Sequence, residues 1–167
     1  TAKKIEQMGG NAIAVECNVS DNASVRSFVS KVFKKFGSVD YLFNNAGTTE
    51  FIDHHDLDAL TDEVWQKIMN TNLMGTFYCC RAAMPHLKAA KGSIVNVSSV
   101  AGLQGHGSSI PYAVSKAAIN CLTKSLAKSF APDVRVNSIA PGPVKTRWLV
   151  GHEHHFDEMV KAMPMGR

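Results

Sequence analysis

Short apolar stretches alternate along this chain with longer amphipathic ones, and this alternation constrains the fold more than any other feature of the sequence. The strand-like stretches lie at residues 12–17, 39–43, 92–97 and 134–140. Helical periodicity, caps and helix-ending glycines mark helices at residues 1–8, 21–36, 61–87, 111–130 and 146–160. Strands that alternate with helices in this way predict an α/β fold, in which helices cover both faces of a parallel sheet.

Neither a linker nor a repeat nor a low-complexity segment interrupts the 167 residues, so we expect a single domain over residues 1–167. Hydrophobic residues make up 45% of the chain and charged residues 19%, which is typical of a folded domain. The net charge of +4 is scattered and predicts neither a nucleic-acid nor a membrane partner. Because no apolar run approaches the roughly 20 residues that span a bilayer and no signal peptide is visible, we expect a cytoplasmic protein.

The sharpest chemical signal is a tyrosine followed four residues later by a lysine, in Tyr112-Ala-Val-Ser-Lys116. On a helix that begins near Pro111, this spacing places both side chains on one face. A phenol has an ordinary pKa of about 10 and is a poor acid or base near neutral pH. A neighbouring ammonium would lower that pKa and so suit the phenol to general acid–base catalysis. The motif alone is equally typical of an amphipathic tyrosine beside a solvated lysine.

Three further features favour the catalytic interpretation. Ser99 follows the third strand, thirteen residues before Tyr112, at the edge where open α/β sheets place their sites. The N-N-A-G stretch at residues 44–47 and the P-G pair at 141–142 follow two other strands at the same edge. Asn72 lies inside the longest predicted helix, where asparagine is a mediocre helix former and core packing does not require it.

In chain order, these pieces are N-N-A-G, an interior helical asparagine, G-S-I-V-N-V-S-S, Y-A-V-S-K and R-V-N-S-I-A-P-G-P-V-K-T. The ordered set resembles the short-chain dehydrogenase/reductase family, and in particular its 3-oxoacyl-carrier-protein reductase-like members. The resemblance covers nearly the whole chain. It implies a Rossmann-like, doubly wound parallel sheet and an oxidoreductase that transfers a hydride between NAD or NADP and a small-molecule carbonyl or alcohol.

The resemblance also implies catalytic roles for four residues. Tyr112 would be the proton donor and acceptor at the substrate oxygen, and Ser99 would hydrogen-bond that oxygen. Lys116 would hold the nicotinamide ribose hydroxyls and lower the pKa of Tyr112. Asn72 would anchor a water molecule that relays protons from Lys116 to solvent.

Coenzyme contacts are implied at several further positions, besides Tyr112 and Lys116. Asn18-Val19 stands where the family usually has Asp-Val against the adenine, and the amide of Asn18 can still donate to and accept from an adenine edge. The residues implied near the adenosine ribose are small enough for a close backbone approach; they are Asn45, Ala46 and Gly47. The residues implied near the nicotinamide and pyrophosphate are Pro141, Gly142, Val144 and Thr146.

Histidines gather in two segments that border the substrate pocket in the family. These histidines are typical either of a metal or acidic-substrate site or of solvated loops, and no metal is predicted because no complete ligand set with a known spacing is present. Gln104 and His106 are candidates for the substrate wall. The four cysteines lack a C-x-x-C pair and are expected to be reduced apolar side chains. The clustered histidines are His54, His55, His152, His154 and His155.

Parts of the family pattern are missing from the sequence. No glycine-rich turn that would seat a pyrophosphate is present, so we expect an incomplete sheet without the first two strands and the last. Two alternatives stay open: an inactive remnant that keeps the fold and the oligomer interface, and a related epimerase or dehydratase. The substrate, the choice between NAD and NADP, and the reaction direction are not determined by the sequence. The resemblance implies a homodimer or homotetramer of the complete enzyme through the two long helices. Core burial and a place at that interface explain equally well the apolar residues Phe77, Ala82, Ala118 and Leu122.

Overall fold

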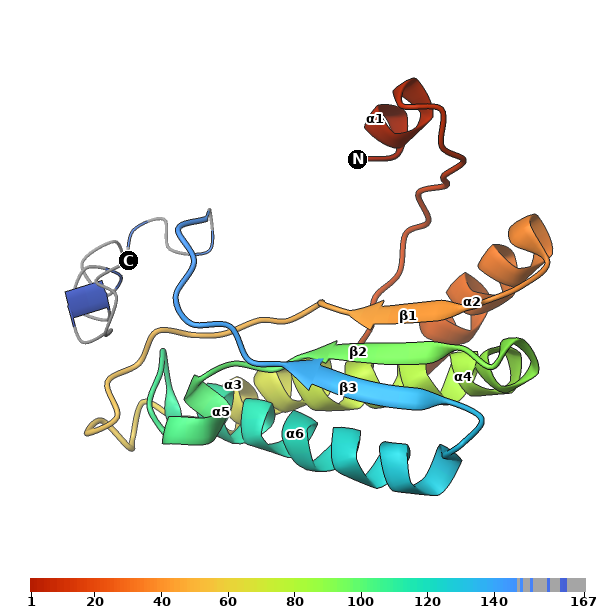
Figure 1. Cartoon of the computed structure of the whole chain (residues 1–167). Coiled ribbons are helices and arrows are strands. Elements are labelled where there is room, and N and C mark those ends of the chain that lie inside the picture. Colours follow the sequence, from red (N-terminus) through yellow and green to blue (C-terminus); the bar gives the residue numbers. More distant parts are fainter. Residues whose placement is uncertain (147, 149–150, 152–155, 157–159, 162–167) are drawn as a thin grey trace.

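A three-stranded parallel sheet forms the centre of the computed structural model, which describes residues 1–146, 148, 151, 156 and 160–161. The strands lie side by side in the order β1, β2, β3 (Figure 1). Three of the four expected strands and the predicted parallel α/β fold are therefore confirmed. The strand bounds are β1 Tyr41–Asn44, β2 Ser93–Val97 and β3 Arg135–Ile139.

Two long helices, α4 (Gly75–Ala90) and α6 (Ile110–Phe130), cover one face of this sheet (Figure 1). A buried apolar cluster lies between them and the strands, and it includes Leu87, Ile94 and Val134. Because burial of such side chains drives folding, this cluster is the main core of the molecule.

The remaining helices pack around this core or lie apart from it. Asp21 caps the first turn of α2 by accepting a 2.8 Å bond from the backbone N–H of Ala23, and Gly37 ends that helix at a left-handed φ of 79°. α2 packs on α4, whereas α1 buries no residue and lies away from the sheet (Figure 1). The bounds are α1 Ala2–Gln7, α2 Asn22–Phe36, α3 Asp62–Met69 and α5 Ala101–Gln104.

The long helix expected over residues 61–87 is found, but with an interruption. α3 begins after Thr61, passes through a π-helical segment η1 (Asn70–Met74), and continues directly into α4. π-helical turns inside helices are rare and occur often at functional sites. This turn contains Asn72, the residue whose presence in a helix the sequence could not explain by packing.

The prediction of a strand at residues 12–17 is wrong. These residues pair with no strand, since β1 is bonded only to β2 within the described part of the chain. A strand requires backbone pairing, whereas apolar side chains can be buried without it. Cys17 and Val19 instead pack on a small cluster formed by Val25, Val29 and Cys79 between α2 and α4.

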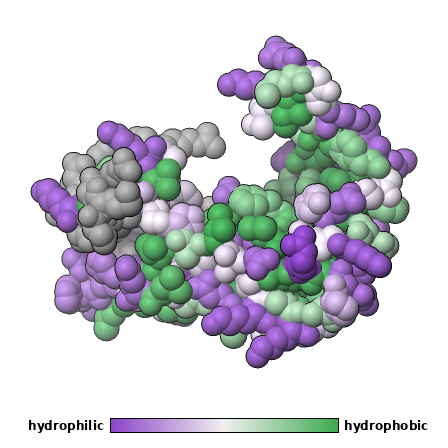
Figure 2. Space-filling view, in the orientation of Figure 1, coloured by the Kyte–Doolittle hydropathy of each residue, from purple (hydrophilic) through white to green (hydrophobic). Residues whose placement is uncertain are grey.

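The sheet face opposite α4 and α6 is exposed in the described residues, contrary to the expectation of helices on both faces. Side chains at alternate strand positions point to it: Tyr41 is 77% exposed, Phe43 59% and Ile139 46%. Figure 2 shows hydrophobic surface over this part of the molecule. An apolar sheet face of this kind is one that a folded protein normally covers.

Candidate active site

The carboxyl ends of β2 and β3 bring Ser99 and the P-G segment together. The backbone N–H of Ser98 donates to the carbonyl of Ile139 over 2.8 Å, and that of Val100 donates to the carbonyl of Pro141 over 3.1 Å. These bonds continue the β2–β3 pairing past the end of the sheet, so Ser99 lies between two residues bonded to the segment that leads to Pro141. The two stretches predicted to meet at this edge do meet there.

Helix α6 supplies Tyr112 and Lys116 from one face. The Lys116 ammonium lies 5.6 Å from the centre of the Tyr112 ring and donates a 2.8 Å hydrogen bond to the carbonyl of Val97. Lys116 is only 4% exposed, and its own carbonyl accepts a 2.9 Å bond from the Ser98 hydroxyl. Gly102 allows this packing, because a Cβ there would lie 2.5 Å from the Lys116 backbone.

Asn72 is fully buried and is held by three hydrogen bonds. Its Oδ1 accepts from the backbone N–H of Thr48 over 2.8 Å, and its Nδ2 donates to the Thr48 carbonyl over 3.0 Å. A third bond joins Nδ2 to the Ser115 hydroxyl over 2.9 Å. Both hydrogens of the side-chain amide are therefore used, and a relay water could bind Asn72 only by donating to an oxygen. The available oxygens are Oδ1, which accepts one bond, and the backbone carbonyl, which accepts a 2.7 Å bond from Thr76.

Gly47 marks the point where three elements converge. A Cβ on this residue would lie 3.4 Å from Oδ1 of Asn72 and 3.7 Å from Nζ of Lys116. The N-N-A-G turn, η1 and α6 thus meet within van der Waals distance. The absence of a side chain at Gly47 leaves room for a ligand to approach the lysine.

The pKa of Tyr112 corrects one expectation. Burial raises it above its ordinary value, and a hydrogen bond with Ser99 opposes that rise. Lys116 is not among the groups that shift this pKa; its ammonium lies 5.6 Å from the centre of the ring and donates to the Val97 carbonyl. Burial lowers the pKa of Lys116 to about 8. The lysine of this pair is the group whose titration lies nearer to neutral pH.

The other predicted coenzyme residues are distributed along the same edge and beyond it. Asn45 and Ala46 are exposed, Pro141 and Gly142 are half-buried, and Val144 and Thr146 are exposed. Val19 packs directly on Gly75, where a Cβ would lie 2.9 Å from the valine side chain. The exposed Asn18 accepts two bonds from Ser20 at its amide oxygen, so its free edge is the amide NH₂.

Two loops form a polar wall near Tyr112. His54 bonds the carbonyl of Gly107 over 3.1 Å, and its ring lies 5.2 Å from that of His106. A Cβ on Gly107 would lie 3.5 Å from the Tyr112 ring. Gln104 is exposed at the end of α5. Of the predicted histidine clusters, His152, His154 and His155 lie outside the described residues. Among the described residues, no three metal-binding side chains gather in one place.

Several residues of the site were not predicted. Trp148 lies 6.3 Å from Tyr112, ring centre to ring centre, and remains 43% exposed. Thr48 and Ser115 hold Asn72, and Ser98 holds the Lys116 backbone. Of these residues, only Ser115 and Ser98 could have been recognised from the sequence. Each is a polar residue next to a catalytic candidate, at a position where the helix or strand pattern favours an apolar one.

Comparison with known proteins decides the family. The family model described as short chain dehydrogenase matches residues 1–155. This chain belongs to the short-chain dehydrogenase family. A ketoacyl reductase of the granaticin polyketide synthase from Streptomyces violaceoruber is 47% identical over 139 residues, which are 83% of this chain and 56% of that protein. A 3-oxoacyl-acyl-carrier-protein reductase from Chlamydia pneumoniae is 36% identical and covers 96% of this chain.

The solved structure of ElxO with NADP bound superposes on this chain with a TM-score of 0.83 at 34% identity over 92% of this chain. The resemblance to 3-oxoacyl-carrier-protein reductases and the Rossmann-like fold are confirmed. The chain spans 56% of the Streptomyces protein, 64% of the Chlamydia protein and 63% of the ElxO chain. In the part of the chain that the structure describes, no helix is both long and apolar enough to cross a membrane.

Proposed function

We propose that this short-chain dehydrogenase interconverts a carbonyl compound and its alcohol with NAD or NADP, and that Tyr112 is its general acid and base. The observation that carries the proposal is the convergence of four side chains from three elements. Ser99 follows β2, Tyr112 and Lys116 share one face of α6, and Asn72 in η1 is bonded to α6 through Ser115. A tyrosine with only a structural role would not need a buried ammonium beside it. Burying a charged group costs free energy, so the presence of Lys116 beside Tyr112 supports a functional role for the pair.

In the reduction direction, the Tyr112 hydroxyl donates its proton to the substrate oxygen. The coenzyme, when bound, supplies the hydride to the carbonyl carbon, so the products are the alcohol and the oxidised coenzyme. Ser99 hydrogen-bonds the substrate oxygen and the phenol, and this second bond opposes the rise in the pKa of Tyr112 and so favours the phenolate that remains. The raised pKa of Tyr112 keeps the phenol protonated and ready to donate at neutral pH.

The residues around Gly47 fit a nicotinamide coenzyme. Gly47 has no side chain on the side that faces Lys116, where a Cβ would lie 3.7 Å from Nζ, so a ribose hydroxyl that approaches from this side could accept from the ammonium. Asn45, Ala46 and the P-G segment would border the rest of the coenzyme. NADP is the first coenzyme to test, because the similar ElxO structure contains it.

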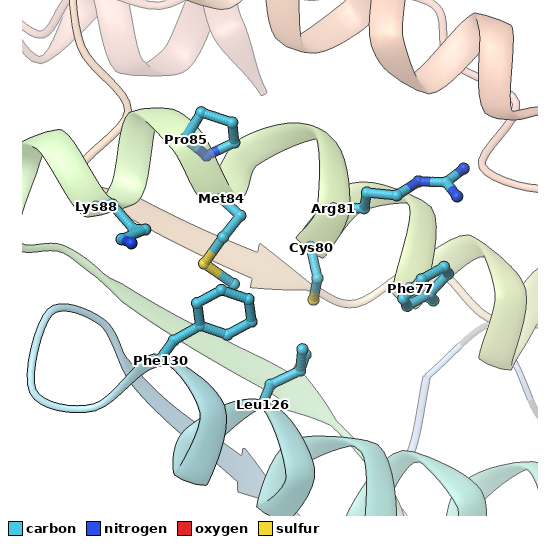
Figure 3. Close-up of a pocket in the computed structure, with 8 residues that line it drawn as sticks. All are labelled: Phe77, Cys80, Arg81, Met84, Pro85, Lys88, Leu126 and Phe130. Carbon is cyan, nitrogen blue, oxygen red and sulfur yellow. The ribbon is translucent and has the colours of Figure 1, made fainter.

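The apolar groove between α4 and α6 supports the proposal that two copies of this chain form a homodimer. It has a volume of about 510 Å³, and Figure 3 shows Cys80 and Met84 of α4 pointing toward Leu126 and Phe130 of α6. An apolar groove between two helices of one chain can bury the same groove of a second copy across a twofold axis. Phe77 lines it as expected, whereas Ala82 packs against the α2 cluster instead. The other lining residues are Cys80, Arg81, Met84, Pro85, Lys88, Leu126 and Phe130.

The test is turnover of a panel of ketones, including a 3-oxoacyl thioester, with NADPH and with NADH. Loss of nicotinamide absorbance that depends on the ketone supports the oxidoreductase. Conversion of substrate without net coenzyme consumption would favour an epimerase or dehydratase, and binding without any conversion would favour the inactive remnant. A cytoplasmic location stays a prediction.

A further inference from the structure

The buried amide of Asn72 is bonded to a serine that belongs to the tyrosine–lysine helix. Two of its three bonds go to the backbone of Thr48, immediately after the N-N-A-G turn. The third crosses to α6 and ends on the Ser115 hydroxyl over 2.9 Å, linking residues 43 positions apart. One side chain therefore connects the end of β1 to α6.

The Ser115 hydroxyl also bonds to the backbone of Tyr112, the proposed catalytic tyrosine. It accepts from Asn72 and donates its one hydrogen to the backbone carbonyl of Tyr112 over 2.7 Å. Ser115 is fully buried, so no water competes for either bond. A helical serine commonly bonds a carbonyl one turn earlier, but such a bond alone is local to the helix. The bond from Asn72 is what ties the helix to another element.

The position of Ser115 in α6 makes its bond to Asn72 important for the geometry of the site. It immediately precedes Lys116, whose Nζ lies near the point where Gly47 and Asn72 converge. A change in how α6 sits on η1 would move Tyr112 and Lys116 together relative to the N-N-A-G turn. Displacements of about an ångström at reacting groups can cost about a hundredfold in rate.

We propose that Ser115 is a positioning residue: its hydroxyl, bonded to Asn72 on one side and to the Tyr112 carbonyl on the other, sets the placement of Tyr112 and Lys116 against the N-N-A-G turn. The proposal rests on the function proposed above for those two residues. It assigns to Ser115 no contact with the substrate or coenzyme.

The experiment compares Ser115→Ala with Ser109→Ala in the full chain. Ser109 is the N-cap residue of the same helix, is also fully buried, and its hydroxyl has no hydrogen-bond partner among the described residues. Each variant removes one hydroxyl oxygen from a fully buried serine, but only Ser115→Ala removes the hydrogen bond between η1 and α6. Ser115→Ala is expected to lower kcat by about ten- to a hundredfold with little change in KM, while Ser109→Ala keeps the wild-type kcat.

A second readout does not depend on turnover. In the wild type, the titration of Lys116, followed by NMR of isotope-labelled lysine ε-carbons, is expected near the depressed pKa of about 8. Ser115→Ala should move this midpoint upward because the loosened helix admits water to the ammonium, and Ser109→Ala should not. General destabilisation would not shift the midpoint of a folded protein.

The outcomes separate the two proposals. If wild type turns over no ketone, the proposed function fails, while the Lys116 midpoints still decide the role of Ser115. If Ser115→Ala matches Ser109→Ala in both kcat and midpoint, the positioning role is overturned. Should Ser115→Ala not fold, Ser115→Cys fills the position with a slightly larger group that is a weaker donor and acceptor, and it should show the same changes in smaller measure.

Discussion

At the scale of single residues, the chemistry of the site depends on how burial shifts the pKa of the Tyr112 phenol and of the Lys116 ammonium. Both Tyr112 and Lys116 are desolvated, and desolvation favours the neutral form of each, so it raises the pKa of the phenol and lowers that of the lysine. The sequence predicted the i, i+4 geometry correctly because helical spacing is local. It could not predict the pKa of Tyr112, which depends on what covers the ring and on where the lysine points.

The desolvated Lys116 should leave a signature in the pH dependence of stability. Its pKa is about 8 in the folded chain and has an ordinary value of 10.5, so between these pH values the unfolded chain binds a proton that the folded chain does not. The contribution of Lys116 to the free energy of unfolding should therefore rise as pH increases above 8. The thiols of Cys79 and Cys80, whose pKa burial raises from 9.0 to about 11 and about 12, act in the opposite direction above pH 9, and Tyr112 does so above its ordinary value of 10.

Chemical denaturation between pH 8 and pH 10 tests this prediction on wild type and Lys116→Met. The free energy of unfolding of wild type minus that of Lys116→Met should rise with pH across this range, because the contribution of the thiols cancels in the difference. The corresponding difference for Lys124→Met, which removes an exposed lysine of the same helix, should stay constant. An unchanged slope in Lys116→Met would show that another group is responsible.

At the scale of elements, buried amides hold the strand ends in place. Asn44 and Asn96 lie directly opposite each other on β1 and β2, and Nδ2 of Asn44 donates to Oδ1 of Asn96 over 2.9 Å. Nδ2 of Asn96 donates in turn to Thr123 on α6 over 3.0 Å. Satisfied networks of this kind fix one register, because a slipped strand would leave each amide unpaired.

Replacing Asn96 by alanine should cost about 1–3 kcal/mol in the free energy of unfolding, since Asn44 would keep only the weak Cys80 thiol as an acceptor. Urea denaturation measures this cost. Asn137→Ala, on the exposed face of β3, is the matched control and should change stability by less than about 0.5 kcal/mol. Equal effects in the two variants would mean that the network adds nothing beyond an ordinary strand residue.

The elements also show where sequence reasoning stops. The ends of β1, β2 and β3 were predictable because apolar runs followed by N-N-A-G, S-S and P-G mark them. The failed strand at 12–17 shows that an apolar run predicts burial but not a pairing partner. The sequence indicated the π-helical turn only indirectly, through an asparagine that helix packing did not require. The three hydrogen bonds of the Asn72 side chain join segments that are far apart in the chain, so they could not be predicted from local sequence.

At the scale of the whole molecule, α4 and α6 pack on one face of the sheet, and an apolar groove lies between these two helices. If two copies meet there, Leu126→Glu should weaken dimerisation at least about tenfold, because it places a charge in the buried interface. Sedimentation at several protein concentrations measures this. Ser125→Glu adds the same charge at an exposed neighbouring position and should leave association unchanged. A wild type that stays monomeric throughout would contradict the proposed interface.

The central claim is that this chain moves a hydride from a nicotinamide coenzyme with Tyr112 as the acid. The most direct test is a single turnover with coenzyme deuterated at the transferring carbon, followed by mass spectrometry of the alcohol. The account predicts one deuterium on the carbinol carbon in wild type and a loss of about a hundred- to ten-thousandfold in rate for Tyr112→Phe, with the exposed Tyr41→Phe unaffected. Alcohol without deuterium, or a Tyr112→Phe variant as fast as wild type, would contradict it.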